Sequence, residues 1–472
     1  MSRILMVASE AAPFVKTGGL ADVLGSLPAA LVKRGDEVAV VLPRFRAALI
    51  DTSERIWHAM PLNVGPHHFV VAIDQVVRQG VRYLFVDCPP LYGRPGIYNE
   101  KNVDYPDNHI RFALLNQAAI GVARYIFRPD VFHAHDWQAG LLAPYLRSTL
   151  AGDPTFFGSK CVITIHNLGY QGNFWALRME EIGLDPVLYH MEGLEFNGMV
   201  SFLKGGIVFS DAVTTVSPTY AREIQTPEYG FGFDGLLRSR NYKLRGILNG
   251  VDYAEWSPET DPYLPSHFSS DDLAGKAECK RALLHEMGLP VHLDRPLIGI
   301  VSRFADQKGF DLVAEIANPL VEQDVAMVVL GSGDKRFEDL FRHFGTVRPD
   351  KFGVRIGYDN ALAHRIEAGS DMFLMPSLYE PCGLNQIYSL RYGTVPIVRA
   401  TGGLDDTVDS ATGFKFGEYS AAALAGAIGE ALHAWQFRAA WTERMRLGMA
   451  KDFSWEASAA EYQRMYAELA SL

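Results

Sequence analysis

The chain has 472 residues, 48% of them hydrophobic and 21% charged, with a formal net charge of −11. That length is too great for one hydrophobic core and predicts two or three domains of ordinary globular composition. The negative charge argues against nucleic acid or an anionic membrane surface as a partner. No apolar run approaches the roughly 18 residues that cross a bilayer, so no membrane partner is expected.

The four cysteines, Cys88, Cys161, Cys279 and Cys382, are scattered along the chain without a CxxC pair. Their spacing argues against a zinc cluster or a disulfide framework and indicates the reducing cytoplasm. The apolar start of the chain is short and runs directly into a glycine motif. It is therefore predicted to be the first strand rather than a signal peptide.

Residues 3–9 form a continuous apolar run, as expected for a strand that is covered on both faces. Gly18 and Gly19 precede a predicted helix over residues 21–34, and residues 37–42 form the next strand. A strand, a helix and a second strand in this order predict a parallel sheet with a glycine turn at one edge.

Lys16 stands before these paired glycines, where a dinucleotide-binding fingerprint would have another glycine. A lysine beside two glycines fits a phosphate better than a dinucleotide. A solvated loop lysine explains the same spacing, so both interpretations stay open.

Two later strands, predicted over residues 129–134 and 161–165, each end in a histidine with polar neighbours. His135-Asp136-Trp137 follows the first strand and His166-Asn167 follows the second. Because the carboxyl ends of parallel strands carry the chemistry of α/β sheets, these side chains are candidate site residues. A pair of metal ligands is disfavoured, because no cysteine or carboxylate cluster completes a coordination set.

An aromatic-rich stretch follows, in which rings are suited to stacking on sugars but more often fill cores. Residues 256–270 are rich in Pro, Ser and Asp and are predicted to be a linker and surface loop. An amphipathic helix is expected over residues 457–469 at the end of the chain, packed back on the first domain.

A second α/β series begins with the apolar run 297–301 and includes strands near residues 371–375 and 395–398. Glu380 and Gly383 follow one of these strands, and the turn Thr401-Gly402-Gly403 follows the other. Two turns rich in N–H groups beside one carboxylate favour a pocket for an anion and a polar ligand together. Ordinary strand-to-helix turns would have the same pattern.

The chain resembles the bacterial glycogen synthases and plant starch synthases over nearly its whole length. The matching stretches are Lys16-Thr-Gly-Gly-Leu20, His135-Asp136-Trp137, His166-Asn167, Tyr170-Gln-Gly172, Leu248-Asn-Gly-Val-Asp252, Ser302-Arg303-Phe304, Gln307-Lys308-Gly309, Glu380-Pro-Cys-Gly-Leu384 and Thr401-Gly-Gly-Leu404.

The resemblance implies an α/β protein with the glycosyltransferase B fold, in which two Rossmann-like, doubly wound parallel-sheet domains face each other across a cleft. The expected domains are 1–248, the starch synthase catalytic domain on the acceptor side, and 249–455, which binds the nucleotide sugar. Residues 456–472 form the C-terminal helical segment.

The implied activity is transfer of glucose from ADP-glucose to the non-reducing-end 4-hydroxyl of an α-1,4-glucan such as glycogen, with retention of configuration. No metal and no pyridoxal phosphate are expected. Alternatives are a transferase that uses UDP-glucose or forms maltose-1-phosphate, a glucan phosphorylase, and a glucan-binding protein without activity.

The resemblance also assigns the site. The catalytic residues are expected to be Lys16, Asp136, His166, Arg303, Lys308 and Glu380. The remaining donor-binding residues are expected to be Gly18, Gly19, Asp22, Asn249, Tyr358, Cys382, Gly383, Leu384, Thr401, Gly402 and Gly403. Trp137, Asn167 and Tyr170 are expected to bind the acceptor.

Charge on the leaving diphosphate would be neutralised by Arg303 and Lys308 and by N–H groups at Leu404 and its neighbours. Glu380 would accept sugar hydroxyls and stabilise positive charge. Many retaining enzymes of this fold carry a second glutamate eight positions further on, but here that position is Tyr388. Double displacement needs a carboxylate on the far face of the sugar. Its absence predicts attack on the same face as departure, with the leaving phosphate helping to deprotonate the acceptor.

Overall fold

The structure is a computed structural model that describes residues 1–101 and 103–471; residue 472 of the predicted C-terminal segment lies outside it. The chain forms two compact units. The first comprises Met1–Val216, Ala221–Gly250 and Trp455–Leu472, and the second comprises Ser217–Tyr220 and Val251–Ser454. Apart from the short segment Ser217–Tyr220, the second unit begins after residue 250, where the sequence predicted a boundary after 248.

The first unit is built on a nine-stranded sheet with the order β14-β13-β9-β8-β1-β2-β5-β4-β3. Strands β14 to β5 of this order are parallel, and β4 and β3 pair antiparallel at one edge. The strands are β1 (Arg3–Val7), β2 (Glu37–Pro43), β3 (Glu54–Val64), β4 (His67–Arg78), β5 (Val81–Asp87), β8 (Val131–His135), β9 (Lys160–Ile165), β13 (Ala212–Thr215) and β14 (Leu244–Gly246). The strand order reverses between β1 and β8, which places the topological switch point at their carboxyl ends.

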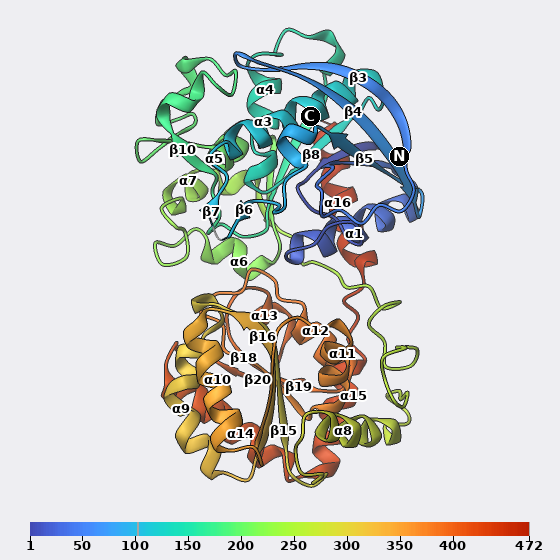
Figure 1. Ribbon diagram of the computed structural model, residues 1–472, viewed down its shortest axis with the longest axis vertical. Coiled ribbons are helices and arrows are strands. Elements are labelled where there is room, and N and C mark those ends of the chain that lie inside the picture. Colours follow the sequence, from blue (N-terminus) through green and yellow to red (C-terminus); the bar gives the residue numbers. More distant parts are fainter. Residues whose placement is uncertain (102, 472) are drawn as a thin grey trace. The chain divides into compact units, whose positions relative to one another are not determined.

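Helices cover this sheet, and the C-terminal helix is one of them. The helices are α1 (Gly19–Lys33), α2 (Pro89–Tyr92), α3 (Asn108–Tyr125), α4 (Leu142–Arg147), α5 (Phe202–Phe209), α6 (Pro218–Glu223), α7 (Asp234–Ser239) and α16 (Trp455–Ala470). Helix α16 contains the predicted amphipathic segment and lies beside α1 (Figure 1). Its Tyr462, Met465 and Tyr466 are buried in one core with Leu24 and Leu27 of α1.

The aromatic-rich stretch contributes a small antiparallel sheet of β10 (Asn173–Trp175), β12 (Met199–Ser201) and β11 (Glu195–Phe196). A two-stranded ribbon of β6 (Asn99–Glu100) and β7 (Val103–Asp104) lies elsewhere in the unit. Phe174 and Phe202 pack ring to ring at 4.8 Å and both contact Trp137. Trp175, by contrast, is 65% exposed. The stretch therefore uses aromatic rings both as core and at the surface.

The second unit has a six-stranded parallel sheet with the order β17-β16-β15-β18-β19-β20. The strands are β15 (Leu297–Phe304), β16 (Ala326–Gly333), β17 (Phe352–Ile356), β18 (Met372–Met375), β19 (Val395–Arg399) and β20 (Phe414–Phe416). Numbered within the unit this is the order 3-2-1-4-5-6 of a dinucleotide-binding sheet, with its switch point between β15 and β18.

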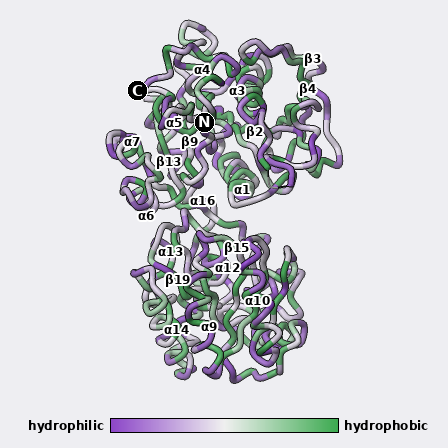
Figure 2. The backbone as a smooth tube through the Cα atoms, turned by 60° about the vertical axis from the view of Figure 1, so that its left-hand side comes forward, coloured by the Kyte–Doolittle hydropathy of each residue, from purple (hydrophilic) through white to green (hydrophobic). Residues whose placement is uncertain are grey.

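Helices cover both faces of this sheet (Figure 1). They are α8 (Ala274–Glu286), α9 (Phe310–Glu322), α10 (Lys335–Val347), α11 (Asn360–Gly369), α12 (Asn385–Arg391), α13 (Gly402–Thr407), α14 (Ala421–Trp435) and α15 (Arg438–Met449). Helices α9, α10 and α14 share one hydrophobic core, whereas α8 and α11 share another on the opposite face. Figure 2 shows hydrophobic and hydrophilic residues alternating along covering helices such as α9 and α14, as expected where one helix face is buried.

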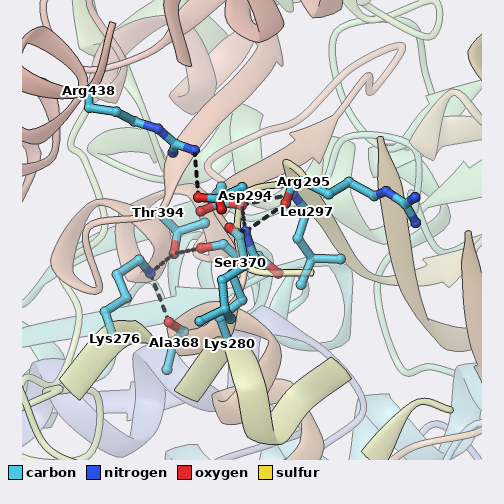
Figure 3. Close-up of polar contacts among 11 residues, drawn as sticks. Lys276, Lys280, Asp294, Arg295, Leu297, Ala368, Ser370, Thr394 and Arg438 are labelled. Carbon is cyan, nitrogen blue, oxygen red and sulfur yellow. Dashed lines mark hydrogen bonds and ion pairs between the residues drawn. The ribbon is translucent and has the colours of Figure 1, made fainter. Parts of the chain in front are cut away.

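Two lysines on α8 form hydrogen bonds to the ends of neighbouring elements (Figure 3). Nζ of Lys276 donates to Ala368 O at 2.8 Å, Tyr392 O at 2.9 Å and Thr394 Oγ1 at 2.7 Å. Nζ of Lys280 donates to Leu293 O, Arg295 O and Asp371 Oδ2, each at 2.7 Å. Because each ammonium has three donors, both buried charges are fully satisfied.

The segment 256–270 has no helix or strand, but the prediction that it is a surface loop is wrong for its anchor residues. The Trp256 ring stacks between His364 and Tyr388, with centroid distances of 3.6 and 3.9 Å. Asp261 is buried and lies 2.7 Å from Nδ1 of His364. Aromatic stacking and one buried carboxylate therefore fix a loop whose composition resembles a linker, and Tyr388 on α12 belongs to that packing.

Candidate active site

A hollow of about 180 Å³ lies at the carboxyl ends of β15 and β18, the switch point of the second sheet. We call it the β15–β18 hollow. It is lined by Val301, Ser302, Arg303, Lys308, Phe310, Leu374, Met375, Pro376, Ser377, Glu380, Gly383, Leu384 and Asn385. Pockets for drug-sized ligands measure about 300–1,000 Å³. The hollow is smaller than these and is therefore suited to part of a ligand, such as one sugar or a diphosphate.

A charged pair lies in this hollow. Nζ of Lys308 is 2.6 Å from Oε2 of Glu380, and the hydroxyl of Ser377 donates to the same oxygen at 3.0 Å. Both charged side chains are largely buried, the carboxylate more than the ammonium. One donor of Lys308 is used on Glu380, and its remaining N–H groups can bind an anion.

The loop that carries Lys308 is tied to the loop that carries Glu380. Gln307 binds that loop through both its side chain and its backbone: Nε2 donates to Tyr379 O at 3.1 Å, and its carbonyl accepts from Leu378 N at 2.8 Å. Gly309 follows with φ 73°, and a Cβ there would lie 2.0 Å from the Pro376 carbonyl. The Gln307-Lys308-Gly309 motif is therefore explained by close backbone packing against the glutamate loop.

The paired glycines of the turn before α13 are explained in the same way. A Cβ on Gly402, whose φ is 46°, would lie 1.8 Å from the Glu380 carbonyl, and one on Gly403 would lie 2.0 Å from the Cys382 carbonyl. Gly403 N donates to that Glu380 carbonyl at 3.1 Å. These glycines let the turn press against the backbone that presents Glu380.

The expectation that N–H groups at Leu404 and its neighbours bind the leaving diphosphate needs correction. Leu404 N and Asp405 N donate to Thr401 O at 3.1 and 3.3 Å, and Gly403 N donates to Glu380 O. Helix α13 has only six residues; its tight first turn uses the N–H groups of Leu404 and Asp405, and the N–H of Gly403 is used on the glutamate loop. The backbone amides after Gly403 are thus already paired in this structure.

The other predicted donor residues of this unit lie at the same sheet edge. Arg303 is the penultimate residue of β15 and lines the hollow. Gly383 and Leu384 line the hollow as well. Cys382 and Thr401 are buried in the loops behind it. Tyr358 follows β17 and is 83% exposed, so its ring face is accessible.

In the first unit the switch point joins the ends of β1 and β8, and here Asp136 follows β8. Asp136 has φ 58°, which is uncommon for a residue other than glycine and is typical of functional sites. Its Oδ1 accepts His166 N at 2.7 Å, and its own N–H donates to Thr164 O at 2.9 Å. Burial raises the pKa of Asp136 to about 7, although backbone N–H groups of His166 and Asn167 oppose the shift.

Three buried histidines lie in this region. Nδ1 of His135 is 3.0 Å from Nε2 of His166, and the ring centroids of His133 and His135 are 4.2 Å apart. Burial lowers the pKa of His166 and of His133 to about 3, and lowers that of His135 well below its usual value. All three rings are therefore neutral near pH 7, so His166 is suited to hydrogen bonding rather than to carrying charge.

Lys16 lies in the loop before α1. Its Nζ is 2.6 Å from Oδ1 of Asp22 in the first turn of that helix. Burial raises the pKa of Asp22, and the ammonium of Lys16 opposes this. A Cβ on Gly18 or on Gly19 would meet nothing within 4 Å. Packing within 4 Å therefore does not require glycine at these two positions.

The loop is held by a residue that sequence reasoning missed. Glu10 follows β1 and is buried; its carboxylate accepts from the hydroxyl of Thr17 at 2.6 Å and also from Thr17 N and the Tyr98 hydroxyl. Its position just beyond the end of the first strand was the available signal. Ser377 in the second unit was missed as well, and only its place between the strand and Glu380 marked it.

The predicted acceptor residues Trp137, Asn167 and Tyr170 follow β8 and β9, which are neighbouring strands of the first sheet. Trp137 begins the 3₁₀ helix η1 (Trp137–Ala139) and packs edge-on against Phe112 at 4.9 Å. Asn167 Oδ1 accepts from Gly169 N at 2.9 Å, and Tyr170 is 57% exposed. The predicted donor residue Asn249 is buried. Of the two aromatic rings, that of Tyr170 is the more accessible.

Neither a metal site nor a membrane span is found in the described part of the chain. Within residues 1–101 and 103–471, no group of three or more His, Cys, Asp or Glu side chains is arranged to hold a metal ion. Over the same residues, no helix has the length and apolar character needed to cross a bilayer.

Two family models match the chain, namely the starch synthase catalytic domain over residues 3–239 and glycosyl transferases group 1 over residues 288–447. A glycogen synthase of Koribacter versatilis is 50% identical over 471 residues, which cover 98% of this chain and 97% of that protein. A glycogen synthase of Anaeromyxobacter dehalogenans is 49% identical over 477 residues, covering 99% and 100%. The catalytic domain of starch synthase IV from Arabidopsis thaliana, solved with ADP and acarbose, superposes with a TM-score of 0.92 at 32% identity, covering all of both chains.

Proposed function

The chain belongs to the family of glycogen synthases and starch synthases, glycosyltransferases with the glycosyltransferase B fold, and from this premise we propose its reaction. The protein transfers glucose from ADP-glucose to the 4-hydroxyl at the non-reducing end of an α-1,4-glucan, with retention of configuration. Glycogen is the proposed acceptor and the cytoplasm the proposed compartment, in keeping with four cysteines that are all free thiols.

The observation that carries this proposal is the Lys308–Glu380 pair in the β15–β18 hollow, with Arg303 in the same wall. A departing nucleoside diphosphate gains negative charge as the glycosidic bond breaks. Lys308 supplies a point charge and Arg303 a bidentate fork for these phosphate oxygens. A preorganised cation in a partly buried hollow stabilises this charge more than water does, because little reorganisation is needed.

Glu380 has a different task in this scheme. Its carboxylate is held by Lys308 and Ser377, so its oxygens are oriented before the donor arrives. A fixed carboxylate accepts hydrogen bonds from sugar hydroxyls and favours positive charge at the anomeric carbon.

The residues around Glu380 support the proposed retention of configuration. Among the described residues that line the hollow, Glu380 alone is a carboxylate. Position 388 holds a tyrosine whose ring stacks on Trp256, so it serves the packing behind α12. With no second carboxylate to form a glycosyl-enzyme, we propose that the acceptor hydroxyl attacks on the face that the diphosphate leaves. The leaving phosphate oxygen takes the hydroxyl proton.

The first unit is assigned through the family resemblance. Lys16, Gly18, Gly19, Asp22 and Asn249 are proposed to act on the donor. Asp136 and His166 act near the transferred glucose, and Trp137, Asn167 and Tyr170 act on the glucan. The open space beside Gly18 and Gly19 supports this assignment.

We propose ADP-glucose rather than UDP-glucose as the donor for two reasons. The starch synthase with which this chain superposes was solved with ADP. The exposed ring of Tyr358 offers a stacking face, which a purine covers more fully than a pyrimidine does. We propose that no metal and no pyridoxal phosphate take part, since Lys308 and Arg303 supply the cations the leaving group needs.

The test is transfer of radiolabelled glucose from ADP-glucose and, separately, from UDP-glucose to glycogen, with and without a chelator. Faster transfer from ADP-glucose, unaffected by the chelator, is expected, with a labelled product that α-1,4-specific amylases release completely. Preferred transfer from UDP-glucose, or formation of maltose-1-phosphate and ADP from ADP-glucose and added glucose-1-phosphate, would replace this proposal with one of its alternatives. A glucosyl group trapped on a side chain would refute the same-face mechanism.

A further inference from the structure

The polar chain behind His166 continues into the interior of the first unit. His135 is fully buried at the end of β8, whereas His166 retains 9% exposure at the end of the neighbouring β9. The two rings are joined through Nδ1 of His135 and Nε2 of His166 at 3.0 Å. One of these nitrogens must carry the shared hydrogen, because two bare lone pairs do not attract each other.

The surroundings of Nε2 of His135 decide which of the two nitrogens carries the shared hydrogen. Nε2 of His135 is buried and has no hydrogen-bond partner among the described residues. If the proton of neutral His135 were on Nε2, a buried N–H would have no acceptor. If it is on Nδ1, only a lone pair is left unused, which is the less costly defect.

The neighbours of His135 do not alter this choice. Nδ1 of His133 is 2.7 Å from the Tyr466 hydroxyl, and its Nε2 is 2.6 Å from Thr164 Oγ1. His133 therefore has a partner at each nitrogen, and its ring packs against that of His135 at a tilt of 30°. Burial also keeps the pKa of His135 and of His166 far below neutrality, so neither ring carries a second proton at pH 7.

We propose that His135 is a positioning residue for glucosyl transfer: its Nδ1–H donates to Nε2 of His166, confines the proton of His166 to Nδ1, and so makes that nitrogen a hydrogen-bond donor toward a substrate oxygen. This inference rests on the proposed function for the identity of the substrate, but the tautomer itself does not. Nδ1 of His166 forms no hydrogen bond within the described part of the chain, so its N–H is available to a ligand.

The tautomer of His166 decides whether its ring donates a hydrogen bond to a ligand or accepts one. A histidine that presents N–H binds hydroxyl, carbonyl or phosphate oxygens as acceptors, and one that presents a bare nitrogen binds only donors. Asp136 holds the backbone of His166 through its N–H at 2.7 Å, which fixes where the residue lies. His135 fixes which hydrogen-bonding role the ring has. The two residues thus control separate properties of the same side chain.

The direct test is long-range ¹H–¹⁵N NMR on the full chain labelled at histidine nitrogens, with the His166 signals assigned by their loss in His166→Gln. In the wild-type protein His166 is expected as the neutral Nδ1–H tautomer. Protonation of His166 at Nε2 would overturn the proposal, and this measurement needs no His135 variant to fold.

Two variants of nearly equal shape supply the functional test. His135→Asn keeps an N–H at the place of Nδ1, and His135→Leu removes it without adding charge. We expect kcat with ADP-glucose and glycogen to fall about tenfold or more in His135→Leu and to stay within about threefold of wild type in His135→Asn, as for loss of one buried orienting hydrogen bond.

Thermal unfolding of both variants is the control for packing. Equal midpoints with unequal kcat support a positioning role, and the Leu variant should show His166 as a mixture of tautomers. Wild-type kcat in His135→Leu, or equal losses in both variants, would overturn it. If the wild-type protein transfers no glucose from ADP-glucose, the proposed function fails, and the NMR measurement still decides the hydrogen bond.

Discussion

Nζ of Lys308 lies 2.6 Å from Oε2 of Glu380, in a hollow at the switch point of the second sheet. The pair makes each residue dependent on the other, because removing one leaves an uncompensated, largely buried charge. We expect Glu380→Ala and Lys308→Ala each to lower kcat by about 10²–10³, as for loss of one preorganised electrostatic group. The double variant should lose far less than the product of the single effects, since the residues act as a unit.

Initial rates of glucosyl transfer at saturating ADP-glucose measure this, with circular dichroism to verify folding. The matched control is the Arg365–Glu286 pair on α11 and α8, whose bidentate contacts are both 2.7 Å. Arg365→Ala should leave kcat within about twofold, because a partly exposed ion pair outside the hollow contributes at most about 1 kcal/mol to folding. Near-normal turnover in either Lys308→Ala or Glu380→Ala would contradict the assignment of the site.

Gly402→Ala is expected to damage the site through the backbone. An added Cβ would lie 1.8 Å from the Glu380 carbonyl at a φ of 46°, so the glutamate loop must move. We expect a loss of about 2 kcal/mol or more in stability together with reduced kcat. Urea unfolding and initial rates would measure both. Gly417→Ala is the matched control, since a Cβ there meets nothing within 4 Å, and its stability should change by less than about 0.5 kcal/mol.

Gly18→Ala, unlike Gly402→Ala, should leave stability unchanged and weaken the binding of ADP-glucose. A Cβ at this position meets nothing within 4 Å, and the backbone is extended, so the free protein tolerates alanine. A substrate that approaches this turn closely does not, and we expect KM for ADP-glucose to rise about tenfold with an unchanged unfolding midpoint. Gly152→Ala, at another open glycine, should alter neither quantity. An unaltered KM in Gly18→Ala would remove the glycine turn from the donor site.

The parallel-sheet pattern allowed much of the site to be predicted. Apolar runs followed by polar motifs place side chains at one edge of a parallel sheet, which is why Arg303, Lys308 and Glu380 line one hollow and His166 lies beside Asp136. The glycines at 309 and 402 were recognised as turn residues. Their real constraint, contact with a carbonyl from another loop, depends on a register that sequence patterns do not contain.

The sequence failed where a single long-range contact decides the structure. Trp256 lies in a stretch with the composition of a linker, yet it stacks on His364 and Tyr388, which are more than a hundred positions away. The N–H groups after Gly403 were predicted to be available, but the short helix uses them internally. Periodicity and composition report local preference, and both cases are tertiary choices.

Lys276 provides a test of how the second unit is held together. Its ammonium donates to Ala368 O, Tyr392 O and Thr394 Oγ1, and burial lowers its pKa to about 8. Lys276→Met leaves these oxygens without a donor, and we expect a loss of about 2–4 kcal/mol in unfolding free energy. Lys335→Met, at a side chain that is 83% exposed, should change it by less than about 0.5 kcal/mol. Equal stability of both variants in urea would show that the three contacts contribute little.

The raised pKa of Asp136 predicts a pH dependence whose sign is set by proton uptake on folding. The pKa is about 7 in the folded protein against 3.8 for the free side chain, because burial disfavours the carboxylate. Between these two values the folded state binds a proton that the unfolded chain has lost. The contribution of Asp136 to stability therefore decreases as pH rises from about 4 to about 7, and it is constant outside that window.

Asp136→Asn isolates this effect, because the amide has nearly the same shape, can accept from the same backbone N–H groups and does not titrate. Other groups titrate in the same range, among them His133 and His166, whose lowered pKa values give the opposite slope. The difference between variant and wild type cancels those contributions. Urea unfolding at pH 5 and pH 7.5 should show the variant gaining stability relative to wild type as pH rises. A difference independent of pH would mean that Asp136 stays ionised throughout, held by the N–H groups of His166 and Asn167 against the effect of burial.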